Sequence, residues 1–252
     1  MKLPALKTAV RDLSEIDRRE FFKAGGAVAT VALSSGVTLM AFGGAASANA
    51  DAGKRWGLLI DVNKCKSDCN ACVTACSDEN GWEDTGNPET DAQWIRKVDL
   101  THKQTGREVS LPMMCQHCEQ PPCVDVCPTG ASFKRADGIV LVDKHACIGC
   151  RYCMMACPFK ARSFVHEPVE NQKSHAPRGN GTVESCTLCV HRVDKGGSPA
   201  CVEACSETGN GAMMFGDLND PASEISQALK QYSSIGLRDD LRLNPGVRYS
   251  NL

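Results

Sequence analysis

Aromatic side chains are scarce in this chain of 252 residues, in which phenylalanine, tryptophan and tyrosine together make up 5%. The formal net charge is only −2, and no basic stripe with interleaved aromatic residues is present. Because nucleic-acid-binding surfaces combine these two features, the sequence indicates no nucleic-acid partner. A glycine-rich nucleotide loop and a paired nucleophile and base are also missing, so we expect no catalytic residues and no substrate site.

Leftover cysteines are absent as well, because all 16 fall into four groups of four, here called the first to fourth quartets. In chain order the quartets are Cys65, Cys69, Cys72 and Cys76; Cys115, Cys118, Cys123 and Cys127; Cys147, Cys150, Cys153 and Cys157; and Cys186, Cys189, Cys201 and Cys205. A disulfide scaffold has no reason to cluster its cysteines at gaps of two and three residues, whereas a metal site does.

The third quartet decides which metal to expect. Its spacing, C-x2-C-x2-C-x3-C-P, is that of bacterial ferredoxins, in which three thiolates hold one cubane and the fourth ligates a neighbouring cluster. Zinc ribbons instead use paired C-x2-C knuckles. The sequence therefore predicts four [4Fe-4S] clusters, although the first quartet has one extra residue after Cys65 and Ser206 stands where two other quartets end in proline.

The N-terminus is typical of an export signal. Residues 17–23 combine a twin arginine with two aromatic residues and a lysine, as in twin-arginine signals. An uncharged stretch rich in Gly, Ala and Ser follows and ends in a small-x-small cleavage site at 48–50. We therefore predict a cleaved signal peptide at 1–50 and folded export to the periplasm; the alternative is an uncleaved membrane anchor, for which the stretch is poorly apolar.

Short strands and turns lie between the quartets. Strands are expected at 56–62 and 211–216, and a hairpin at 94–111, which would dock a partner or cover a cluster. A second hairpin is expected around Asp137-Gly138, because this dipeptide separates two apolar runs. Asp220-Pro221 predicts the start of a helix, and an extended tail follows at 243–249.

The six histidines have no spacing typical of metal ligands. His117 lies inside the second quartet, which is complete without it, so we expect it to pack or hydrogen-bond near a cluster. The other five, His102, His145, His166, His175 and His191, are predicted to be surface residues.

At the four quartets, the sequence resembles the four-cluster iron–sulfur subunits of the dimethyl-sulfoxide reductase, polysulfide reductase and formate-dependent nitrite reductase systems (the DmsB, PsrB and NrfC type). The resemblance covers residues 55–220. It implies an α+β fold of nested, tandem two-cluster ferredoxin-like domains with short β-hairpins and long loops. The outer domain would comprise 51–114 and 166–221, the inner domain 115–165, and a C-terminal helix and extended tail would occupy 222–252.

The same resemblance implies that the quartets exchange their last cysteines, first with fourth and second with third. The four implied ligand sets are Cys65, Cys69, Cys72 and Cys205; Cys186, Cys189, Cys201 and Cys76; Cys115, Cys118, Cys123 and Cys157; and Cys147, Cys150, Cys153 and Cys127.

Within this superfamily, segments such as 186–192 and 215–221 resemble the periplasmic subunits of DsrMKJOP-type membrane complexes of sulfur metabolism. This implies electron transfer without substrate chemistry, next to an NrfD-like quinone-interacting integral membrane protein. A periplasmic cytochrome c and further iron–sulfur subunits would be additional partners. Two alternatives stay open: the electron-transfer subunit of a periplasmic molybdopterin oxidoreductase, and a free periplasmic ferredoxin.

Overall fold

The computed structural model describes residues 30–34, 37–40 and 50–252, except 88 and 171. The chain divides into two units, Met1–Ala48 and Asn49–Leu252. In the first, β1 (Thr30–Ser34) pairs antiparallel with β2 (Val37–Met40). The twin-arginine motif at 17–23 lies outside the described residues, so the signal peptide stays a prediction.

A four-stranded sheet, ordered β10-β3-β12-β11, forms one end of the second unit. Its strands are β3 (Trp56–Asp61), β10 (Met213–Asp217), β11 (Ser234–Ile235) and β12 (Val247–Ser250). Most of β3 is apolar and buried, so this strand can lie between two neighbours. It pairs antiparallel with β10 and parallel with β12, which incorporates the C-terminal tail into the sheet.

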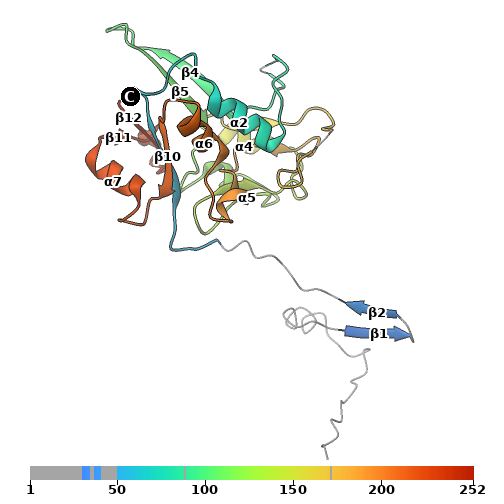
Figure 1. The fold of residues 1–252 in the computed structure, drawn as a ribbon. Coiled ribbons are helices and arrows are strands. Elements are labelled where there is room, and N and C mark those ends of the chain that lie inside the picture. Colours follow the sequence, from blue (N-terminus) through green and yellow to red (C-terminus); the bar gives the residue numbers. More distant parts are fainter. Residues whose placement is uncertain (1–29, 35–36, 41–49, 88, 171) are drawn as a thin grey trace, which may run out of the picture. The chain divides into compact units, whose positions relative to one another are not determined.

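Helix α7 (Glu224–Gln231) packs on this sheet through Ile225 and Ala228, which contact Leu59. Figure 1 shows it beside β10, β11 and β12. The helix starts later than Asp220-Pro221 predicts, because the Ser223 side chain accepts from Ser226 N and caps the helix. In the described part of the chain, no helix is both long and apolar enough to span a membrane.

Three hairpins join the cysteine-bearing segments. The expected hairpins are confirmed as β4 (Ile95–Thr101) with β5 (Glu108–Met114), and β6 (Ser132–Lys134) with β7 (Val140–Val142). A third pairs β8 (Ser163–Phe164) with β9 (Val183–Glu184). The tight turn before β7 depends on Gly138, whose φ of +86° a residue with a Cβ rarely adopts.

Short helices carry many of the cysteines. These are α2 (Ala71–Asn80), α3 (Pro122–Asp125), α4 (Tyr152–Ala156), α5 (Val190–Val193) and α6 (Ala200–Glu207), and a 3-10 turn, η2 (Asp239–Leu241), follows later. Helix α2 lies against α6, and α3 against α4. These contacts bring the first quartet to the fourth and the second to the third in an α+β fold. The domain boundaries given above stay a prediction.

Candidate metal centres

Each of the 16 cysteines lies within the described residues and is a free thiol, of which eleven are buried, four half-buried and one, Cys150, exposed. Disulfides therefore play no part in this fold. Buried cysteines recur throughout the main apolar core, so the core is built around them.

Three cavities of nearly equal size are each walled by four cysteines. Their volumes are about 330, 320 and 310 Å³, and we call them sites II, III and IV. Site II is lined by Cys76, Cys186, Cys189 and Cys201; site III by Cys115, Cys118, Cys123 and Cys157; and site IV by Cys127, Cys147, Cys150 and Cys153. Each takes three cysteines from one quartet and the last cysteine of another, which is the arrangement that the resemblance implies.

The remaining four cysteines form site I. Burial, followed by the charges of Cys65, Cys205 and Cys69, raises the pKa of Cys72 to about 11, so these four side chains lie close together. The departures from ferredoxin spacing, after Cys65 and after Cys205, both fall here. The two half-buried cysteines Cys65 and Cys69 give this site partial access to solvent.

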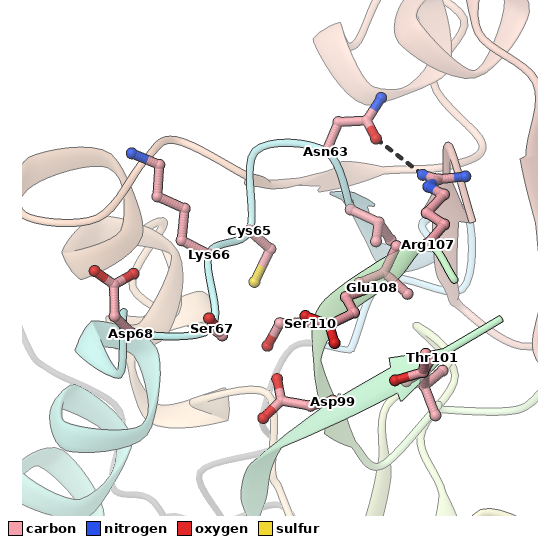
Figure 2. A pocket seen from close by; sticks show the side chains of 13 residues that line it. Asn63, Cys65, Lys66, Ser67, Asp68, Asp99, Thr101, Arg107, Glu108 and Ser110 are labelled. Atoms are coloured by element: carbon pink, nitrogen blue, oxygen red, sulfur yellow. Dashed lines mark hydrogen bonds between the residues drawn. The ribbon is translucent and has the colours of Figure 1, made fainter. Parts of the chain in front are cut away.

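Site I opens onto a groove of about 780 Å³ between residues 62–68 and the β4–β5 hairpin. Figure 2 shows the Cys65 sulfur pointing into this groove, with Asp99 and Ser110 opposite and Arg107 bonded to Asn63 at its rim. Lys97, on β4, donates to Cys65 Sγ over 3.3 Å. The hairpin therefore covers site I.

The four sites follow one another in numerical order. Burial first, and then neighbouring charges that include Cys72 of site I, raise the pKa of Cys201 in site II. Cys115 of site III likewise adds to the burial that raises the pKa of Cys186 in site II. Cys123 of site III is affected in the same way by Cys153 of site IV. All eight cysteines of sites II and III are buried, so access is confined to the two ends of the row.

The residues around the sites fit a cofactor held by thiolates. Burial raises the pKa of Cys76, Cys115 and Cys118 to about 12, so without a metal these groups would be neutral thiols. Yet N–H groups point at the sulfurs, as expected for ligating thiolates. The backbone donors are Leu188 N to Cys186, Ala212 N to Cys205, Ser132 N to Cys127 and Val183 N to Cys147, at 3.2–3.4 Å.

One turn recurs in three quartets. The residue just before the second cysteine has a positive φ: His117 at 42°, Gly149 at 69° and Leu188 at 54°. Only the third quartet has glycine there, the residue that adopts this conformation without strain. The first quartet has its extra residue within the same gap, and Asp68 does not adopt a positive φ.

The histidines are placed as expected only in part. His117 is buried beside site III, its Nδ1 accepts from Val140 N over 3.0 Å, and burial lowers its pKa to about 4. His175 and His191 are not isolated surface residues, because their rings lie 4.0 Å apart and both face Glu79. Sequence reasoning missed this cluster, since 112 residues separate Glu79 from His191.

The Glu79 cluster is already satisfied internally. The hydrogen bond from His191 Nε2, at 2.6 Å, holds the pKa of Glu79 below its usual value, and Arg192 lies 3.4 Å from the same carboxylate. The cluster ties the end of α2 to α5 and so braces the loop that carries Cys189.

Comparison with known proteins agrees with this geometry. Two families, both described as 4Fe-4S dicluster domains, match residues 64–131 and 108–218. An iron–sulfur subunit of an Hdr-like menaquinol oxidoreductase from Archaeoglobus fulgidus is 43% identical over 79% of this chain and 84% of its own length. The chain belongs to the 4Fe-4S dicluster family.

Other members of the dicluster family include a tetrathionate reductase subunit from Salmonella typhimurium, which is 40% identical over 71% of this chain and 64% of its own length. A protein NrfC homolog from Haemophilus influenzae is 35% identical over 91% of this chain and 92% of its own length. Two dicluster domains with 16 cysteines fit four [4Fe-4S] clusters. The chain is thus an iron–sulfur electron-transfer subunit of the kind found in menaquinol and molybdopterin oxidoreductase complexes.

Proposed function

We propose that this chain carries electrons through sites I to IV as the periplasmic iron–sulfur subunit of a membrane-bound, quinone-linked redox complex of sulfur metabolism, of the DsrO type. Each site holds one [4Fe-4S] cluster on its four cysteines as assigned above. The observation that carries this proposal is the row of four sites with partly exposed cysteines only at its ends. Such a row can accept electrons at one end and deliver them at the other.

Site IV has the surface that a partner protein needs. Around the exposed Cys150, the side chains of Ile148, Tyr152 and Met155 are 67%, 58% and 75% exposed. Large apolar side chains grouped around one loop favour a protein interface over free solvent. This patch supports membership of a complex over a free periplasmic ferredoxin, the third hypothesis.

The partners follow from the proposed complex. An NrfD-like quinone-interacting integral membrane protein would hold the chain at the membrane, and a periplasmic cytochrome c with further iron–sulfur subunits would complete the path. The alternative is the electron-transfer subunit of a periplasmic molybdopterin oxidoreductase. The 40% identity to a tetrathionate reductase subunit supports that alternative.

Purification from membranes tests these hypotheses. Haem together with a quinone-binding partner supports the proposed complex, molybdenum supports the alternative, and an unaccompanied soluble protein supports a free carrier. About 16 irons per chain are expected, since each of the four cubanes holds four. About four irons, or no cubane signal by electron paramagnetic resonance (EPR) after reduction, would reject all three hypotheses.

Export is tested separately. Replacing Arg18 and Arg19 by lysine should leave the chain, with its clusters, in the cytoplasm. Fractionation of cells that produce the wild type and the variant measures this. Periplasmic accumulation of the double-lysine variant would contradict the twin-arginine route.

A further inference from the structure

Arg162 lies between two of the cysteine-walled cavities. It is 6% exposed and lines both site III and site IV. Its Nη2 donates to Cys123 Sγ of site III over 3.2 Å and to Ser132 Oγ over 2.7 Å. On the other side, burial raises the pKa of Cys153, a residue of site IV, and the Arg162 charge opposes that effect. One guanidinium therefore acts on both sites.

This guanidinium has no carboxylate partner among the described residues, and its Nη1 is buried without an acceptor. Arg135 makes the contrast clear, because it is similarly buried but forms ion pairs with Asp137 and Asp194. A buried charge is costly unless something opposite in charge compensates it. At Arg162 the nearby opposite charges are cysteine thiolates, so its charge is directed at the groups that the cysteines bind.

Site II has no comparable group. Among the described residues that line it, none is charged. The donors to Cys76 Sγ are the neutral groups Asn80 Nδ2 at 3.5 Å and Trp82 Nε1 at 3.4 Å. Glu79 and Arg192, whose charges reach Cys189 of this site, are paired with each other.

A cluster gains negative charge when it is reduced, so a nearby cation stabilises the reduced form and raises the reduction potential. Hydrogen bonds to the ligand sulfurs act in the same direction. We propose that Arg162 is a potential-setting residue shared by sites III and IV, and that it holds both clusters at a higher reduction potential than the cluster of site II. Electrons then rest on the III–IV pair, and passage through site II is the uphill step of the row. This inference rests on the proposed function.

The test is an EPR-monitored potentiometric titration of the purified, four-cluster protein with dithionite. Arg162→Gln should lower two of the four potentials, each by at least a tenfold change in the one-electron equilibrium, or about 59 mV, and leave the other two unchanged. Arg162→Lys keeps the charge and should retain most of both potentials. Arg238→Gln removes an exposed arginine paired with Asp240 and should change none.

The lowest-potential couple is assigned with Trp82→Phe, which removes a donor to Cys76 and should shift only that couple further down. Four unchanged potentials in Arg162→Gln, or a Trp82→Phe shift in a couple that is not the lowest, would overturn the inference. If Arg162→Gln loses a cluster, an Arg162→Lys protein whose two couples fall as far as the tenfold limit would overturn it too. In each of these cases reversible four-cluster reduction leaves the proposed function intact, whereas absence of cubane signals in the wild type rejects that function itself.

Discussion

Cys157 is the last cysteine of the third quartet, yet it lines the same cavity as Cys118 of the second. The burial of Cys118 and the charges of its neighbours, Cys157 among them, raise its pKa to about 12. Helix α4 ends just before Cys157, whose backbone is extended, so this side chain leaves the helix away from the loop that precedes it. The short helix is thus what separates the fourth cysteine from the first three.

This exchange predicts which cluster depends on Cys157. Cys157→Ser should damage the cluster of site III and spare that of site IV, because serine is a poorer ligand at one position only. The EPR couple that changes should be the one altered by Cys118→Ser, and different from the one altered by Cys150→Ser. The matched variant Cys127→Ser should show the reverse. A Cys157→Ser protein that shares its altered couple with Cys150→Ser would refute the assignment.

Two glycines with the same backbone conformation should respond differently to alanine. Gly149 and Gly130 both have φ of +69°, which costs a residue with a Cβ about 1–2 kcal/mol. A Cβ on Gly149 would also clash with the Gly181 carbonyl oxygen, whereas nothing lies within 4 Å of one on Gly130. Gly149→Ala should therefore lose the site IV cluster and hold about 12 irons per chain, while Gly130→Ala keeps about 16. Equal iron contents would contradict this expectation.

The apolar patch at site IV predicts a contact with a partner protein. Met155→Asp places a charge in the centre of that contact and should reduce retention in the membrane complex about tenfold. Leu241→Asp changes a similarly apolar exposed residue of η2 and should have no effect. Co-purification with membrane partners is the measurement, with iron content showing that both variants keep their clusters. Equal retention of the two would argue against docking at site IV.

Tyr249 predicts a loss of stability in alkali. Its hydroxyl donates to Pro112 O over 2.9 Å, and burial raises its pKa above the usual value of 10.0. The folded state therefore favours the neutral phenol, so its contribution is full below about pH 10 and is lost as the pH rises further. Tyr249→Phe should lower the free energy of unfolding by about 1 kcal/mol at pH 7.

The same variant should also lose the part of the alkaline decline that comes from this phenol. Urea midpoints of the anaerobic four-cluster protein between pH 7 and 11 measure both effects. An identical decline above pH 10 in wild type and variant would assign the pH dependence to other groups.

Much of the fold could be predicted because its signals are local. The two hairpins, strand β3 and strand β10 follow from short apolar runs and turn residues such as Asp137-Gly138. The start of α7 was misplaced, since Asp220-Pro221 and Ser223 are both good helix-start signals and only the packing of Ile225 on the sheet selects between them. Nothing in the tail predicts its parallel pairing with β3, because that pairing joins residues at opposite ends of the unit.

The number of clusters and their chemistry were determined by the sequence alone, because cysteine spacing within a loop limits which sulfurs can surround one metal group. Arg162, Lys97 and Trp82 show what the spacing cannot contain. Each reaches a sulfur through the tertiary fold, and no local pattern marks it. The order of the sites, the closed middle of the row and the charge between sites III and IV were decided only when distant segments packed together.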